Sequence, residues 1–194
     1  MMGLLNPYLD FYDAMPSSFR RDRSVPISAV EMLLPEWLKL KSAIAAHFAW
    51  AVPTEEAVRT ILKYSPNVIE IGAGSGYWAW TMRQVGITVA AFDASPPAFT
   101  WHEVVPGDER AVLLYPGHAL FLCWPPWNSE MAYNALSYHQ GNYVLYVGEW
   151  WSGSASPRFF EQLVSTFEAI EVVAIPQWFS RDDRLMIFRR RSAQ

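Results

Sequence analysis

The sequence predicts a three-layer α/β fold whose sheet has about seven strands, mostly parallel, with a C-terminal antiparallel hairpin and an N-terminal helical extension. Short apolar runs typical of buried strands alternate with segments of helical period from residue 53 onward, as they do in a sheet covered on both faces. Near the end, apolar runs at 172–175 and 185–189 follow each other without a helix between them. This second observation predicts the antiparallel hairpin.

The chain of 194 residues has no internal repeat and no long polar or low-complexity stretch, which indicates one domain with a sizeable core. Ten Trp, nine Tyr and eleven Phe residues are many for this length. Some of these rings belong to the core, and the surplus suggests an aromatic-lined cavity or a protein interface.

Charge and cysteine content exclude several classes of partner and site. A net charge of −4 and a sequence pI near 5.5 disfavour long DNA or RNA. Cys123 is the only cysteine, so an internal disulfide and a cysteine-based zinc site are excluded, and no metal is expected. Apolar runs such as 43–52 are too short to cross a bilayer, and the N-terminus lacks the features of a signal peptide. We therefore expect a cytoplasmic protein without a membrane partner.

Residues 1–52 precede the first strand and are expected to form several helices. An amphipathic segment over 32–41 is interrupted by Pro35. The acidic, aromatic opening at 8–13 is interpreted as a docked surface helix in preference to a lid. Trp50, just before the next helix, is interpreted as a core residue in preference to a pocket residue.

Three further helix starts are indicated by capping residues. Thr54, followed by two acids, begins a helix that ends before Pro66. Ser129 can cap a helix, and Pro157 stands at the first position of the last one. Helical spacing predicts that these two helices bury Ala132, Ala135, Leu136, Phe160, Leu163, Val164 and Phe167.

The most informative stretch is 67–77, where an apolar strand runs into a glycine turn and then a helix. An acid and three glycines stand at every second position: Glu70, Gly72, Gly74 and Gly76. Glycines let the chain turn tightly and let a ligand lie against bare backbone, and the following helix N-terminus favours an anionic group. A dinucleotide-binding fingerprint would need its third glycine at position 77, where Tyr77 stands. An oxidoreductase is therefore disfavoured.

This pattern resembles the first motif of the class I S-adenosylmethionine-dependent methyltransferases, which have a Rossmann-like fold. The resemblance covers roughly residues 53–190. It implies an S-adenosylmethionine-binding domain at 53–194, with residues 1–52 as an extension or cap of the same domain. It also implies that Glu70 helps hold the α-ammonium group of this cofactor. A glycine turn that merely joins a strand to a helix is the alternative interpretation.

Two more acids follow strands at positions where the methyltransferases contact their cofactor. A second strand over 86–93 ends in Asp93, about twenty residues after the first glycine, where a ribose-binding carboxylate belongs. A third strand is expected at 101–105, and Asp108 after it is a candidate for the adenine amino group. Turn formation explains both acids without a ligand. The cofactor-binding residues implied by the resemblance are Glu70, Gly72, Ala73, Gly74, Gly76, Asp93, Ala94, Asp108 and Cys123.

Residues 118–127 form an apolar strand that runs into a diproline corner. They resemble the fourth motif of the amino-group methyltransferases, Asn/Asp-Pro-Pro-aromatic, and small bacterial methyltransferase-like proteins with a Trp-Pro-Pro motif. Trp124 stands where the Asn or Asp should accept a hydrogen bond from the target amine, and an indole can only donate. Trp124, Pro125 and Trp127 are instead expected to bind substrate, with Trp124 as an aromatic wall beside the transferred methyl group. A diproline loop packed by two tryptophans is the alternative.

A fifth strand over 143–149 ends in an acid that is the best-placed general base. Glu149 follows a strand end expected to face the ligand crevice, and the neighbouring Trp150 and Trp151 could raise its pKa by desolvation. A solvated loop acid is an equally good interpretation.

We therefore expect an S-adenosylmethionine-dependent methyltransferase that acts on an N, O or carboxylate atom of a small molecule or a short peptide. The alternative is a non-catalytic module of the same fold that binds S-adenosylmethionine or a protein partner. The intact glycine turn with Asp93 favours ligand binding, and the replacement of Asn or Asp by Trp124 keeps the alternative open.

Overall fold

The structure is a computed structural model that describes residues 3–20, 34–151, 153–179 and 181–192. Its helices are α1 (Pro7–Ala14), α3 (Leu34–His47), α4 (Glu55–Tyr64), α5 (Tyr77–Gln84), α6 (Met131–Tyr138) and α7 (Pro157–Thr166), with 3-10 turns η1 (Ser17–Phe19) and η2 (Glu109–Leu114). Its strands are β1 (Asn67–Ile71), β2 (Thr88–Asp93), β3 (Val105–Pro106), β4 (Ala119–Cys123), β5 (Tyr143–Gly148), β6 (Phe167–Ala174) and β7 (Arg184–Arg190).

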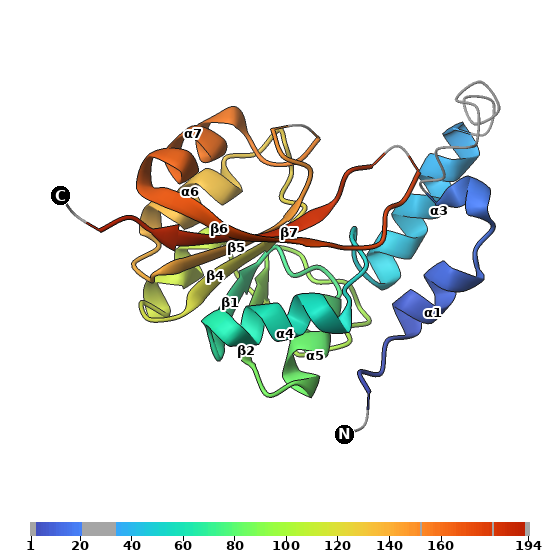
Figure 1. The fold of residues 1–194 in the computed structure, drawn as a ribbon, viewed down its shortest axis with the longest axis horizontal. Coiled ribbons are helices and arrows are strands. Elements are labelled where there is room, and N and C mark those ends of the chain that lie inside the picture. Colours follow the sequence, from blue (N-terminus) through green and yellow to red (C-terminus); the bar gives the residue numbers. More distant parts are fainter. Residues whose placement is uncertain (1–2, 21–33, 152, 180, 193–194) are drawn as a thin grey trace.

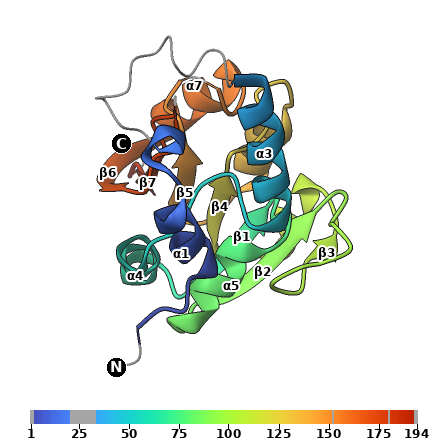
Figure 2. The same cartoon turned by 90° about the vertical axis from the view of Figure 1, so that its right-hand side faces the viewer.

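The expected three-layer α/β fold is confirmed. One seven-stranded sheet has the order β3-β2-β1-β4-β5-β7-β6. Strands β1 to β5 pair in parallel, and β7 runs antiparallel between β5 and β6. Helices α4 and α5 lie on one side of the sheet and α6 and α7 on the other (Figure 1). Helices α1 and α3 lie across the end of the sheet where the parallel strands finish (Figures 1 and 2).

The alternation of side chains along β1 divides the core between the two faces of the sheet. Val68 packs with Ile61 of α4 and Met82 of α5. Its neighbour Ile69 belongs to the opposite cluster, together with Phe160 of α7. Because β1 is buried on both faces, it reads as a continuous apolar run rather than as an alternating one.

The helix starts follow their capping residues. Thr54 Oγ1 accepts a hydrogen bond from the Ala57 N–H at 3.1 Å and begins α4. Ser129 Oγ accepts from the Met131 N–H at 3.2 Å at the start of α6. These side chains satisfy backbone donors that the first turn of a helix leaves without partners.

Two expectations for the second half of the chain were wrong in detail. The third strand begins at Val105, not at Trp101, because the Trp101 N–H donates to the Ser75 carbonyl and its indole N–H to the His47 carbonyl, both at 2.8 Å. Val164 is exposed, because the buried stripe of α7 runs through Phe159, Phe160 and Leu163. Phe167 is buried, but it begins β6 rather than ending the helix.

The N-terminal region also differs from expectation. Pro35 does not break the segment, because it is the second residue of α3, where its missing N–H would have no helical partner anyway. The start of the predicted segment, at 32–33, lies outside the described residues. Helix α1 is docked, with Tyr8 and Tyr12 buried in an aromatic cluster around Trp178.

Tyr77 fastens α1 to the glycine turn. Its hydroxyl accepts a hydrogen bond from the Tyr8 N–H and donates one to Asn6 Oδ1, both at 2.9 Å. The bulky residue that disfavours a dinucleotide site therefore holds the N-terminal helix against the turn.

Replacing Gly76 by alanine is expected to destabilise the protein by about 2–4 kcal/mol, from left-handed strain and overpacking together. Gly76 has φ +71°, and a Cβ there would lie 2.8 Å from Val104 Cγ2 and 3.2 Å from the His102 carbonyl oxygen. Urea unfolding measures the decrease in the free energy of unfolding. The matched control is Gly74→Ala, where φ is +53° and a Cβ would meet nothing within 4 Å, so only the strain remains. Equal losses in the two variants would refute the packing argument.

Candidate functional site

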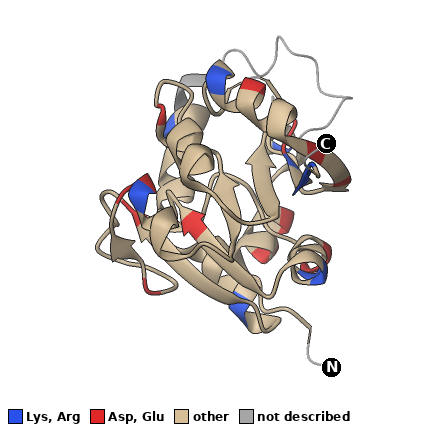
Figure 3. Cartoon of the chain, turned by 90° about the vertical axis from the view of Figure 1, so that its left-hand side faces the viewer, with Lys and Arg blue, Asp and Glu red and all other residues tan. Residues whose placement is uncertain are grey.

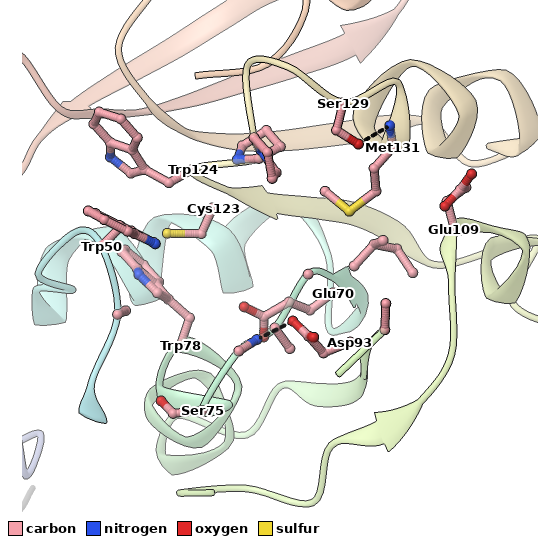
Figure 4. A pocket seen from close by; sticks show the side chains of 18 of the residues that line it. Trp50, Glu70, Ser75, Trp78, Asp93, Glu109, Cys123, Trp124, Ser129 and Met131 are labelled. Atoms are coloured by element: carbon pink, nitrogen blue, oxygen red, sulfur yellow. Dashed lines mark hydrogen bonds between the residues drawn. The ribbon is translucent and has the colours of Figure 1, made fainter. Parts of the chain in front are cut away.

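A cavity of about 440 Å³ lies at the end of the sheet where β1, β2 and β4 finish. The glycine turn, the residues that follow β2, the diproline corner and the segment after α3 surround it (Figure 4). Its volume is within the range of small-molecule and cofactor sites. The predicted site residues that line it are Glu70, Gly72, Ala73, Gly74, Asp93, Ala94, Asp108, Cys123, Trp124 and Pro125.

Asp93 joins the end of β2 to the glycine turn. Its Oδ2 accepts a hydrogen bond from the Gly74 N–H at 2.8 Å (Figure 4). Its Oδ1 accepts a hydrogen bond from the Ser95 N–H at 2.8 Å. The turn itself is tied to β2, because the N–H groups of Gly72 and Ala73 both donate to the Phe92 carbonyl. Both carboxylate oxygens thus accept from backbone, which orients Asp93 at the rim of the turn.

Glu70 is a buried carboxyl group on the floor of the cavity. It is 2 % exposed, and its Oε2 has no hydrogen-bond partner among the described residues. Burial raises its pKa to about 8, and the charge of Asp93 acts in the same direction, whereas the Ala79 N–H at the start of α5 lowers it. A buried carboxylate oxygen without a hydrogen-bond partner is costly, so Oε2 of Glu70 is suited to a cationic or hydrogen-bond-donating group in the cavity.

Asp108 stands at the far side of the cavity, at the start of η2. Its Oδ1 accepts a hydrogen bond from the Arg110 N–H at 3.0 Å, and the Arg110 guanidinium pairs with its carboxylate. This side-chain contact lowers the pKa of Asp108. The next residue, Glu109, also lines the cavity and accepts from the Asn134 amide at 2.9 Å.

Trp124 forms the opposite wall, next to Cys123. Its backbone has φ 51°, an uncommon conformation for a non-glycine residue, and its indole N–H donates to Asp183 Oδ1 at 2.7 Å. Asp183 is completely buried, and its Oδ2 has no partner among the described residues. Burial raises the pKa of Asp183 to about 7, while the positive charge of Lys41 acts against this shift. Cys123 directly precedes Trp124, and burial raises the pKa of its thiol.

No protein-family model matches the sequence, and no curated protein matches it. Solved structures that match most of the chain include two methyltransferases. Magnesium protoporphyrin IX methyltransferase from Synechocystis PCC 6803, with bound S-adenosylmethionine, is 12 % identical with a TM-score of 0.50, over 98 % of this chain and 100 % of that one. The 1,6-didemethyltoxoflavin-N1-methyltransferase of Burkholderia thailandensis, with bound 1,6-didemethyltoxoflavin and S-adenosylhomocysteine, is 12 % identical with a TM-score of 0.50, over 88 % and 92 %. The fold is that of the class I S-adenosylmethionine-dependent methyltransferases.

Three predicted site residues of this methyltransferase fold do not line the cavity. Gly76 packs beneath the turn. Trp127 is 67 % exposed and lines a separate apolar hollow beside Trp151. Glu149 is buried, where its Oε1 accepts from the Asp182 N–H at 3.0 Å and its Oε2 pairs with Arg181 at 3.4 Å.

Several residues that line the cavity were not predicted as site residues. Trp50 lines the cavity and is 41 % exposed, so its interpretation as a core residue was wrong. Its position just before α4 was the signal that could have identified it. Phe48, Trp78 and Met131 also line the cavity. Asp183, which holds Trp124, carries no local signal, because it is 59 residues away in sequence.

Within the described residues, no group of three or more His, Cys, Asp or Glu side chains is arranged to hold a metal ion. No described helix of this methyltransferase fold has the length and apolar character that spanning a membrane requires.

Proposed function

We propose that the protein is a methyltransferase that uses S-adenosylmethionine to methylate an N, O or carboxylate atom of a small molecule or a short peptide. The observation that carries the proposal is the meeting of three features in one cavity: the glycine turn, the carboxyl group of Glu70 with its unpartnered Oε2, and Asp93 at the end of β2. The fold, shared with methyltransferases of known structure, supports it.

The residues present fit the cofactor chemically. S-adenosylmethionine carries an ammonium group, which suits the buried Glu70 that has no other partner at Oε2. Its ribose hydroxyls suit Asp93, and the bare backbone of Gly72 and Gly74 suits close approach of its methionine part. Asp108 is proposed for the adenine amino group, because its carboxylate lines the far side of the cavity.

When bound, S-adenosylmethionine would supply an activated methyl group and would leave as S-adenosylhomocysteine; an N–H or O–H acceptor would also lose a proton, whereas a carboxylate would not. The task of the protein is then to hold the acceptor in line and to exclude water. Trp124 presents its ring to the cavity, because its indole N–H is already donated to Asp183.

In this proposal Glu149 is not the general base. It would have to leave both the Asp182 N–H and Arg181 before it could accept a proton from an acceptor. We assign it to supporting the segment that carries Asp183. Positioning rather than proton abstraction then supplies most of the rate acceleration.

Long nucleic acid is not part of the proposal. The net charge is −4, and Lys and Arg positions lie among Asp and Glu in the ribbon (Figure 3). Strand β7 carries Arg184, Arg189 and Arg190, but Arg184 pairs with Asp182 and Arg189 pairs with Glu168. Binding to a polyanion normally needs a basic patch.

Replacing Asp93 by alanine is expected to weaken the binding of S-adenosylmethionine about tenfold to a hundredfold, because hydrogen bonds to a charged group contribute roughly 1.5–3 kcal/mol. Calorimetric titration with S-adenosylmethionine and S-adenosylhomocysteine tests this, with NADH as the specificity control. Glu161→Ala, an exposed site on α7, is the matched control for loss of one negative charge.

Micromolar binding that collapses in Asp93→Ala and persists in Glu161→Ala would support the proposal. Failure of the unmodified protein to bind either ligand would overturn it, and the interaction module would then be the better interpretation.

A further inference from the structure

One end of the cavity is built from aromatic and apolar groups. Trp50 and Trp124 both line it, with ring centroids 6.1 Å apart and planes inclined by 32° (Figure 4). Pro125 and Pro126 of the diproline corner, which follow Trp124 in the sequence, also line the cavity. Trp50 is 41 % exposed although it borders a cavity, so much of its ring is open to an incoming molecule.

Buried charged side chains from other parts of the chain contact the backbone of Trp50 and the indole of Trp124. Lys41 of α3 is 4 % exposed, and its Nζ donates to the Trp50 carbonyl and, at 3.4 Å, to the Tyr8 hydroxyl. Asp183, before β7, accepts the Trp124 indole N–H at 2.7 Å. Because Asp183 and Lys41 are buried, the Trp124 ring and the backbone of Trp50 are already oriented before any ligand arrives. Such preorganisation reduces the entropic cost of binding.

The charges around the cavity are unsuited to an anionic acceptor. Four acids line it: Glu70, Asp93, Asp108 and Glu109. Among the described lining residues there is no lysine or arginine. Arg181 lies 5.0 Å from the centroid of the Trp124 ring, but it is paired with Glu149. Lys41 Nζ lies 5.8 Å from the centroid of the Trp50 ring, but it donates to the Trp50 carbonyl. A carboxylate or phosphate on the acceptor would therefore find no basic side chain in the described lining.

Resting on the methyltransferase proposed above, we propose that the methyl acceptor is a flat, uncharged aromatic molecule that lies against Trp50 and Trp124, with Asp183 as the positioning residue of this wall. Aromatic rings favour offset or edge-to-face contact with indoles, and such contacts discriminate flat from saturated rings. Asp183 does not touch the acceptor; it acts by fixing the orientation of Trp124.

The test uses the full chain saturated with S-adenosylhomocysteine, so that probes cannot occupy the cofactor end. Three probes are titrated by calorimetry or ligand-observed NMR: quinoline, which is flat and uncharged at pH 7.5; 2-naphthoate, which is flat and anionic; and cyclohexanecarboxamide, which is uncharged and not flat. Quinoline is expected to bind about tenfold more tightly than either of the others. Equal binding of 2-naphthoate or of cyclohexanecarboxamide would overturn the proposal.

Single substitutions test whether quinoline binds beside Trp124. Trp124→Asn is expected to weaken quinoline about tenfold, and asparagine tolerates the left-handed backbone found at this position. Trp150→Leu is the matched control, because Trp150 is 39 % exposed but lies outside the cavity lining. A loss in Trp127→Leu equal to that in Trp124→Asn would assign quinoline to the separate hollow and overturn the proposal.

The role of Asp183 is tested by rescue. Asp183→Ala is expected to weaken quinoline binding as Trp124→Asn does, and Asp183→Asn, which keeps an oxygen acceptor for the indole N–H, is expected to restore it. Trp124→Phe keeps a ring but loses the donor, so it reports the lost anchor independently if Asp183→Ala does not fold. Unchanged quinoline binding in Asp183→Ala or in Trp124→Phe would overturn this role.

The inference and the proposed function fail in different ways. If the protein binds S-adenosylhomocysteine but shows no preference for quinoline, only this inference fails. If the protein does not bind S-adenosylhomocysteine, the proposed function fails.

Discussion

The Glu70→Gln variant is expected to be more stable than the unmodified protein at pH 8 and to lose binding of S-adenosylmethionine. Burial raises the pKa of Glu70 from its ordinary value of 4.5 to about 8. The folded protein therefore holds this proton more tightly than the unfolded chain does. The stability that Glu70 contributes is present below pH 4.5 and is lost as the pH rises towards 8.

Glutamine cannot ionise, so the variant escapes this loss. The gain at pH 8 is on the order of 3–4 kcal/mol, and it should vanish near pH 4, where the unmodified Glu70 carries its proton in both states. Thermal unfolding of both proteins across this pH range isolates the contribution of Glu70 from that of other groups. A constant difference between the two curves would show that Glu70 is not the buried acid described above.

The expected loss of S-adenosylmethionine binding in Glu70→Gln is measured separately from stability. A cationic ammonium group near Glu70 should displace its proton, so binding at pH 7 should release a proton from this side chain. Calorimetry in two buffers of different ionisation enthalpy measures the released proton, which should be missing for any residual binding by Glu70→Gln. Affinity of the variant equal to that of the unmodified protein would exclude Glu70 as the ammonium partner.

The Trp178→Ala variant is expected to lose about 3–5 kcal/mol of stability, the usual cost of truncating a buried tryptophan. Trp178 is completely buried, its ring centroid lies 4.8 Å from that of Tyr12 and 5.3 Å from that of Trp37, and its indole N–H donates to the Tyr8 hydroxyl. Lys41 Nζ lies 4.7 Å from the centroid of its ring. One substitution therefore removes the common contact of α1, α3 and the segment before β7.

Hydrogen exchange distinguishes local from global effects of this change. We expect amides of α1 to exchange faster while those of β1 and β4 stay protected, because the sheet has its own two core clusters. Trp151→Ala, at a site that is 47 % exposed, is the control and should cost about 1 kcal/mol or less. Uniform loss of protection in Trp178→Ala would mean that the aromatic cluster and the sheet unfold as one unit.

The sheet could be predicted because its signals are local. The apolar run of β1, the glycines after it and the acid at the end of β2 are each visible within a few residues, and parallel topology brings the strand ends together. The same local reasoning failed at Trp101, whose position in the sequence suggests a strand. Its backbone and indole donors instead bond to the glycine turn and to the end of α3.

The aromatic wall could be predicted only in part. The diproline corner identified Trp124, but nothing near it in sequence indicates that Asp183 accepts a hydrogen bond from its indole, or that Lys41 of α3 donates to the Trp50 carbonyl. Trp50 looked like a core residue because tryptophan is usually buried, and only tertiary packing leaves it beside a cavity. Contacts of this kind depend on the folded topology rather than on local pattern.

The last segment before β7 also has a consequence for the order in which a newly made chain can fold. The Gln177 carbonyl accepts a hydrogen bond from the Tyr12 hydroxyl, and Asp183 accepts one from the Trp124 indole N–H. A ribosome adds about 5–20 residues per second, so α1 emerges many seconds before the residues that cover it. Until then the rings of Tyr8 and Tyr12 lack their final surface and are available to chaperones. The residues that line the cavity end at Met131, but the Trp124 ring receives its hydrogen-bond partner only once Asp183 has been added.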